Sequence, residues 1–113
     1  MPVTEYEAAG LQKIKHFIDA NIQQHFTIGE LSLRAGMGET KLKILFKQNF
    51  NTSIYAYLIR IRMLKAEQLL LETDYPLKKI AYLTGYKYTP NLIHAFRLRF
   101  GISPIQYRKI KNQ

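Results

Sequence analysis

Four residues between positions 40 and 47 share one face of an expected helix and have side chains suited to reading DNA bases. Thr40, Lys43, Ile44 and Lys47 are spaced by three or four residues, which places them together on a helix. Lysine can donate hydrogen bonds to O6 and N7 of guanine, and isoleucine can pack on the methyl group of thymine. The spacing predicts base contacts by Thr40, Lys43 and Ile44 and a phosphate contact by Lys47.

A second set of residues with the same potential chemistry lies between positions 89 and 97. Pro90, Ile93, His94 and Arg97 fall on one face of another expected helix, and Thr89 stands at its start. His94 is the best candidate for a base contact, with Thr89 near the helix start and Arg97 on phosphate. Pro90 and Ile93 offer no hydrogen bonds, so this helix is expected to read methyl groups and DNA shape, or mostly to grip the backbone. We therefore expect the first set to determine most of the sequence preference.

Basic side chains elsewhere are candidates for phosphate contacts, which position a protein on DNA without specifying sequence. A tyrosine hydroxyl can also donate to phosphate. The predicted phosphate-contacting residues are Lys41, Lys47, Arg60, Arg62, Lys78, Lys79, Tyr88, Arg97, Arg108 and Lys109.

Charge is distributed unevenly along the 113 residues, which carry a net charge of +9. Residues 1–74 hold nine basic and eight acidic side chains, whereas residues 75–113 hold eight basic and none acidic. This asymmetry indicates a polyanionic partner, and by charge alone DNA, RNA and an anionic membrane surface all fit. No apolar run approaches the length of a membrane span. The absence of cysteine fits a reducing compartment, and we expect a cytoplasmic, nucleoid-associated protein.

Helical periodicity and capping residues predict an all-α chain of about seven helices. Thr4 and Thr27 each precede a glutamate by three residues, which is the pattern of a capping box. These caps open expected helices from Glu5 to about Gln24 and after Thr27. Further helices are expected at about 39–50 and 54–72. A short helix before the Gly85 turn, one capped by Thr89 and one capped by Ser103 complete the chain.

The sequence repeats itself at an offset of about fifty residues. Shifted by 50, Leu42 and Phe46 match Leu92 and Phe96, and Tyr57 matches Tyr107. The repeat predicts two helix-turn-helix lobes, at about 5–53 and 75–110, joined by a long connecting helix at about 54–72. Gly10 is an unfavourable residue within the first expected helix.

The repeated pattern resembles the DNA-binding domain of the AraC/XylS family of bacterial transcription regulators. The resemblance rests on Ile80-Ala81, Gly85-Tyr86, Ala95-Phe96-Arg97, Phe100-Gly101-Ile102-Ser103-Pro104 and Tyr107-Arg108, with a corresponding pattern in the first half of the chain. It implies a regulator, expected to be an activator, that inserts two recognition helices into successive major-groove segments of double-stranded DNA. It also implies contact with RNA polymerase and, in many members, an effector or dimerisation domain that this chain has no room for. The apolar Pro90 and Ile93 depart from the polar pattern usual in the family.

Other kinds of chemistry have little support in the sequence. The histidines His16, His25 and His94 lack the spacing of metal ligands, and no acidic pair is arranged for acid–base catalysis. We therefore expect no metal, no cofactor, no enzymatic activity and no membrane partner. The alternative to a sequence-specific regulator is a nonspecific nucleic-acid-binding module that binds by charge.

Overall fold

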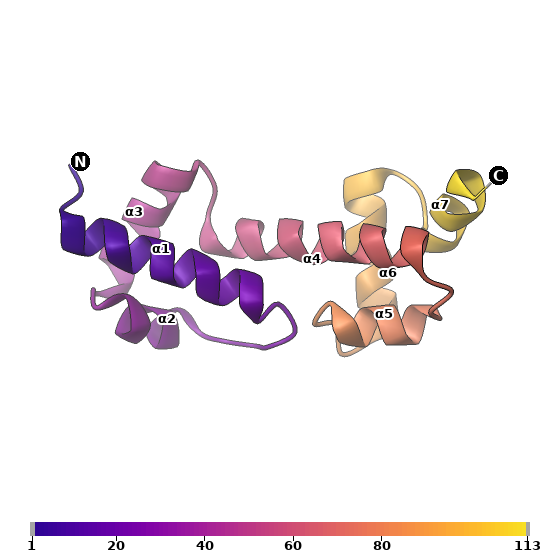
Figure 1. Ribbon diagram of the computed structural model, residues 1–113, viewed down its shortest axis with the longest axis horizontal. Helices are drawn as coiled ribbons and strands as arrows, with labels where there is room; N and C mark the ends of the chain where they lie inside the picture. Colours follow the sequence, from indigo (N-terminus) through magenta and orange to yellow (C-terminus); the bar gives the residue numbers. More distant parts are fainter. Residues whose placement is uncertain (1, 113) are drawn as a thin grey trace. The chain divides into compact units, whose positions relative to one another are not determined.

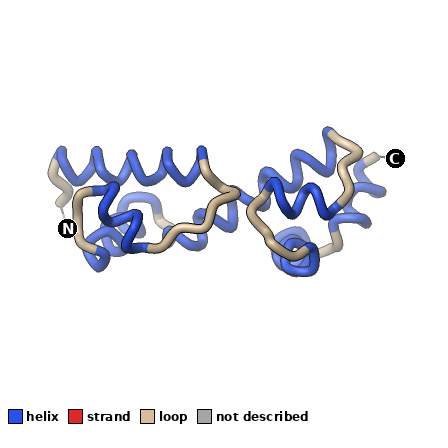
Figure 2. The backbone as a smooth tube through the Cα atoms, turned by 90° about the horizontal axis from the view of Figure 1, so that it is seen from below, coloured by secondary structure: helices blue, strands red, loops and turns tan. Residues whose placement is uncertain are grey.

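The computed structural model describes residues 2–112, and within them it contains only helices and loops (Figure 2). Seven helices follow one another within this described part of the chain, which confirms the predicted all-α class. They are α1 (Glu5–Ala20), α2 (Ile28–Ala35), α3 (Glu39–Phe50), α4 (Ile54–Glu72), α5 (Leu77–Leu83), α6 (Thr89–Phe100) and α7 (Pro104–Lys111).

Local sequence signals determine most helix ends. Thr4 and Ser103 form capping boxes at the starts of α1 and α7, and the Thr27 side chain accepts a hydrogen bond from the backbone N–H of Glu30. Helices α3 and α6 both end at a left-handed residue, Asn51 with φ +58° and Gly101 with φ +83°. Each such residue turns the chain out of the helix.

Two predicted helix ends are wrong by one to a few residues. Helix α1 ends at Ala20 rather than near Gln24, because the Asn21 side chain donates to the Phe17 carbonyl at 2.9 Å and replaces the next helical bond. Helix α6 already includes Thr89, and Tyr88 is its N-cap. The early start is tolerated because the first-turn N–H groups have no partner in a helix, so Pro90 loses no bond there.

The chain divides into two compact units after Leu58, within helix α4. The beginning of α4 belongs to the first unit and the remainder to the second. Since residues of α4 are buried on both sides of this boundary, the helix is part of both cores. The predicted connecting helix has the expected bounds, but each of its ends is built into a lobe.

The first unit packs α1, α2 and α3 against one another (Figure 1). Its core is formed by apolar side chains from each helix and from the start of α4, namely Leu11, Ile14, Ile18, Leu31, Ala35, Leu42, Leu45, Phe46, Ile54, Tyr57 and Leu58. The spacing of these residues by three or four along each helix is what brings them to one face.

Gly10 allows α1 and α2 to approach closely. The residue is buried, and a Cβ atom added to it would lie 2.5 Å from the backbone carbonyl oxygen of Ala35 and 3.3 Å from the Met37 side chain. No other residue type fits at this distance without a backbone shift. The sequence marked Gly10 only as a cost to the helix, whereas the structure makes it the contact point between two helices.

The second unit packs α6 against α5 and α7, with the end of α4 completing the core (Figure 1). Its buried side chains are Met63, Ala66, Leu69, Leu70, Ile80, Ala81, Leu92 and Phe96. Leu64 is 45% exposed, whereas the neighbouring Met63 is fully buried. The apolar residues surround most of α4, so its sequence did not determine which side faces inward.

The internal repeat is preserved as repeated packing. Phe46 contacts Phe50 and Tyr57 in the first unit, and Phe96 contacts Phe100 and Tyr107 in the second. Tyrosine hydroxyls also donate to carboxylates at matching places, Tyr57 to Asp19 and Tyr107 to Glu67. The hydrogen bond to the Glu67 carboxylate, together with burial, raises the pKa of Tyr107. Each hydroxyl therefore ties the last helix of its unit to the first.

Candidate nucleic-acid interface

Helix α3 has one buried face and one exposed face. Leu42, Leu45 and Phe46 are fully buried and hold the helix on the first unit. The predicted reading residues Thr40, Lys43, Ile44 and Lys47 are all exposed on the other side. Ile44 remains 49% exposed although it is a large apolar side chain. The structure therefore brings the first predicted set together on an open helix surface.

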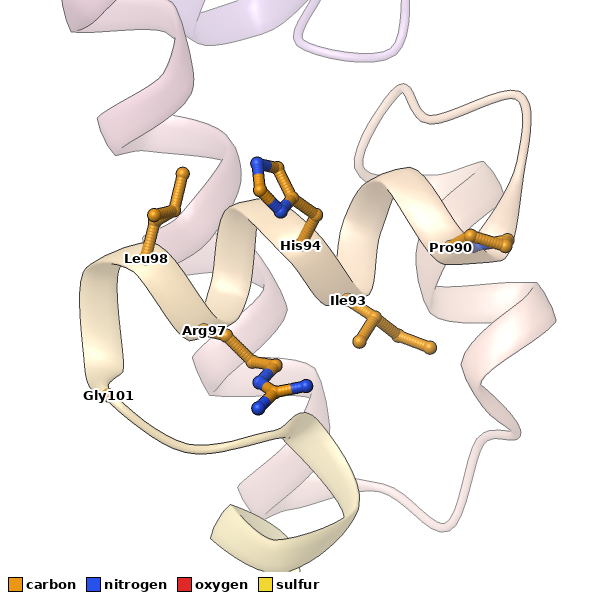
Figure 3. Close-up of a pocket in the computed structure, with 6 residues that line it drawn as sticks. All are labelled: Pro90, Ile93, His94, Arg97, Leu98 and Gly101. Atoms are coloured by element: carbon orange, nitrogen blue, oxygen red, sulfur yellow. The ribbon is translucent and has the colours of Figure 1, made fainter.

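Helix α6 has the same organisation in the second unit. Leu92 and Phe96 are fully buried, whereas Pro90, His94 and Arg97 are exposed and Ile93 is half-buried. These four outward residues border a hollow of about 500 Å³ together with Leu98 and Gly101 (Figure 3). In Figure 3 His94 and Leu98 project to one side of α6, and Ile93 and Arg97 project to the other. Thr89 lies at the first position of the helix and is half-buried.

A second hollow, of about 400 Å³, lies beside the turn between α5 and α6. It brings the predicted phosphate residues Lys78 and Tyr88 together with Thr89 and Pro90, and it also includes Lys87. Lys87 is exposed, and its ammonium lies 5.5 Å from the centre of the Tyr88 ring. Sequence reasoning missed Lys87, although its position between Tyr86 and Tyr88 in a helix-turn-helix turn is a detectable signal.

Most of the predicted phosphate residues are accessible to a phosphate. Lys79 is exposed, with its ammonium 3.8 Å from the centre of the Tyr75 ring, and Tyr88 is 58% exposed. The exposed members of the predicted set are Lys41, Lys47, Arg60, Lys78, Lys79, Tyr88, Arg97 and Lys109. Lys41, Arg62 and Arg108 have other roles.

Lys41 forms an ion pair with the Glu7 carboxylate and so joins α3 to α1. The same carboxylate accepts the backbone N–H of Thr4 in the capping box. The hydrogen bond from Lys41, together with the bond from Thr4, lowers the pKa of Glu7. The pair holds α3 against α1, and Lys41 is not among the proposed phosphate contacts.

Arg62 is buried instead of lying on the surface. It is only 6% exposed, and its guanidinium lies 5.5 Å from the centre of the Tyr86 ring. A phosphate group cannot reach a side chain that is packed inside the second unit, so the predicted phosphate contact is wrong in this structure. The sequence could not reveal this burial because arginine at a helical position is usually exposed.

Arg108 caps the end of helix α4. Its Nε donates to the Leu70 carbonyl at 3.0 Å, and a terminal nitrogen donates to the Thr73 carbonyl at 3.2 Å. The last carbonyls of a helix have no partner within the helix, and a cation there also interacts favourably with the helix dipole. The predicted phosphate contact by Arg108 is therefore replaced by a structural role within the second unit.

We expect Arg108→Ala to lower the free energy of unfolding by about 2 kcal/mol, because hydrogen bonds to a charged group contribute about 1.5–3 kcal/mol. Arg108→Lys should restore little of this loss, since one ammonium cannot reproduce two parallel donors. Urea denaturation followed by circular dichroism measures both variants. Lys109→Ala, at the exposed neighbouring position, is the matched control and should stay within about 0.5 kcal/mol of the unmodified protein. Unchanged stability in Arg108→Ala with a weaker salt dependence of DNA binding would restore the phosphate role.

Among residues 2–112 no group of three or more histidine, cysteine, aspartate or glutamate side chains is arranged to hold a metal ion. No helix in the described part of the chain is long and apolar enough to cross a membrane.

Residues 31–110 match the family described as "Helix-turn-helix domain". The chain belongs to this family, and its fold and relatives identify it as a DNA-binding domain of the AraC/XylS type. The match covers both exposed helix faces described above.

Three known proteins illustrate the similarity. The lactose operon transcription activator of Staphylococcus xylosus is 34% identical over 98 residues, which are 87% of this chain and 35% of that protein. The DNA-binding domain of the global transcriptional factor AdpA, solved in complex with a target DNA, has a TM-score of 0.84 and 26% identity, and covers 89% of this chain and 91% of that one. A regulator from Chromobacterium violaceum with an AraC-type DNA-binding domain has a TM-score of 0.82 and 25% identity, and covers 94% and 95% of the two chains.

The chain spans less than half of the length of the first curated relatives it matches.

Proposed function

We propose that this domain binds double-stranded DNA sequence-specifically as part of a bacterial transcription regulator. Helices α3 and α6 enter successive segments of the major groove and read bases with their exposed faces. The observation that carries the proposal is the exposed face of each helix, which presents Thr40, Lys43 and Ile44 on α3 and His94 and Arg97 on α6. Each face lies opposite a fully buried one, which is the arrangement of a recognition helix.

The basic side chains around α5 and α6 support binding to the DNA backbone. Residues 75–113 carry eight lysine or arginine residues and no acidic residue. In the proposed complex Lys78, Lys87 and Tyr88, which border one hollow, contact phosphate near the start of α6. Such contacts position the helix in the groove without selecting the sequence.

We further propose that the domain serves an activator and that an exposed surface contacts RNA polymerase. The support is the name of the Staphylococcus xylosus relative, a transcription activator. A transcription assay with the full regulator and the selected site tests this part. Stimulation of transcription that requires the site supports activation, and reduced transcription contradicts it.

Selection from a random duplex library tests the DNA-binding proposal. We expect an asymmetric motif with two blocks about one turn apart, roughly 10 base pairs. The selected site should bind at least ~10³-fold more tightly than scrambled DNA, and affinity should fall steeply with salt because several phosphates are neutralised. Salt-sensitive binding to every duplex, with no enriched motif, would support a nonspecific nucleic-acid-binding module instead.

Lys43→Ala should relax the preferred site more than His94→Ala does. A good base contact contributes about 1–3 kcal/mol of discrimination, which corresponds to roughly 5–150-fold between the preferred base and its competitors. In the proposed complex Lys43, on the exposed face of α3, donates hydrogen bonds to a guanine edge. His94 instead lies among apolar side chains on α6. Repeating the library selection with each variant measures the change. A larger relaxation in His94→Ala would show that the second unit carries more of the specificity.

A further inference from the structure

We propose that helix α6 recognises the C5-methyl group of thymine, with Ile93 as the residue that contacts it and Pro90 beside it. The inference rests on the proposed function and specifies what the second unit reads. It predicts that part of the binding site is defined by methyl groups rather than by hydrogen-bonding patterns. Cytosine methylated at C5 would then be bound in place of thymine.

The hollow on α6 is lined in part by apolar side chains. Three of its six lining residues, Pro90, Ile93 and Leu98, have purely hydrocarbon side chains. Pro90 and Ile93 lie in the first half of the helix, the part of a recognition helix that contacts base edges. Leu98 lies in the second half and is 75% exposed. Figure 3 shows the Ile93 side chain extending outward from α6, on the same side as Arg97.

The chemistry of the major groove gives this surface one matching partner. Base edges there present hydrogen-bond donors and acceptors, and the thymine methyl is the apolar exception. Placing Pro90 and Ile93 against polar edges would remove water from those edges without replacing their hydrogen bonds, which is unfavourable. Placing the same side chains against a methyl group removes apolar surface from water on both partners, which is favourable.

The charge around the hollow favours DNA over an apolar protein partner. His94 and Arg97 border it, Arg99 is exposed on the same helix, and no acidic residue occurs in residues 75–113. An apolar surface within a basic region complements a methyl group within a polyanion. On helix α3 the exposed face combines Ile44 with Thr40 and Lys43, whose side chains can donate hydrogen bonds.

Replacing thymine by deoxyuridine tests the proposal directly, since this change removes the methyl group and leaves base pairing and the O4 acceptor intact. Each thymine of the selected duplex is replaced singly, and the dissociation constant is measured by fluorescence anisotropy. We expect at least one replacement to weaken binding about fourfold, the effect of one buried methyl-sized group. With cytosine at that position, methylation at C5 should strengthen binding by a similar factor.

Ile93→Ala identifies the residue responsible. At the sensitive thymine, this variant should bind the thymine and deoxyuridine duplexes equally. His94→Ala, one position further on the same helix, is the matched control and should lower affinity for both duplexes while keeping the fourfold ratio. Because Ile93 is half-buried, a thermal melt must show that Ile93→Ala is folded. Ile93→Val, which retains a branched side chain, provides a second variant and should keep part of the ratio.

Two results would overturn the proposal while leaving sequence-specific binding in place. One is that replacing any thymine by deoxyuridine changes the dissociation constant by less than about 1.5-fold. The other is that a sensitive thymine keeps its ratio in folded Ile93→Ala. Failure of the proposed function is distinguishable from both, because the library would then yield no preferred duplex at all.

Discussion

Phe96→Ala should destabilise the second unit by about 3–5 kcal/mol, the usual cost of removing a large aromatic side chain from a core. Phe96 is fully buried and lies at the centre of the packing between α6 and α7. Its ring centre is 4.4 Å from that of Phe100 and 5.4 Å from that of Tyr107. A typical domain is stable by only about 5–15 kcal/mol, so this variant should lose much of its folded population near body temperature.

Hydrogen exchange of individual amides measures this effect where it occurs. Protection should fall in α5, α6 and α7, whereas α1, α2 and α3 should keep theirs, because the two units have separate cores. Leu98→Ala is the matched control, since it removes a large side chain from the same helix at a position that is mostly exposed. It should stay within about 0.5 kcal/mol of the unmodified protein. If Phe96→Ala lowered the free energy of unfolding of the second unit by less than about 1 kcal/mol, the assigned core would be contradicted.

Gly10→Ala should destabilise the first unit by about 2 kcal/mol or more, although alanine is the better helix former by about 1 kcal/mol. The added methyl group would lie 2.5 Å from the Ala35 carbonyl oxygen. That atom belongs to the backbone at the end of α2, next to the turn that leads into α3. Relieving the clash requires α1 and α2 to move apart, and this should also shift α3 and weaken DNA binding.

Gly29→Ala provides the control for Gly10→Ala. Gly29 also lies in a helix, but its nearest contact to an added Cβ is an ordinary 3.5 Å, to the end of the Glu39 side chain. Gly29→Ala should have the same free energy of unfolding as the unmodified protein, or a slightly higher one. Urea denaturation of both variants gives the comparison. Equal free energies of unfolding for Gly10→Ala and Gly29→Ala would contradict the need for a close approach of α1 and α2.

The helices and their exposed faces could be predicted because the signals are local. A cap such as Ser103 acts on the backbone three residues away, and Asn51 or Gly101 ends a helix through its own φ angle. Periodicity then assigned Lys43 and His94 to exposed faces, since core residues repeat every three or four positions on a helix. The same reasoning could not orient α4, where apolar residues surround most of the helix and Leu64 is exposed beside the buried Met63.

By itself, the sequence therefore determined the all-α class, the internal repeat and the outward faces of α3 and α6. Only the tertiary structure decided which of the other basic side chains are engaged within the protein. Arg108 reaches the end of α4 across 35 to 38 residues of chain, Lys41 pairs with Glu7 on another helix, and Arg62 is buried beside Tyr86. Gly10 likewise became important through a contact with a distant carbonyl. Contacts of this kind depend on how separate helices approach one another, and residue spacing within a single helix carries no information about that approach.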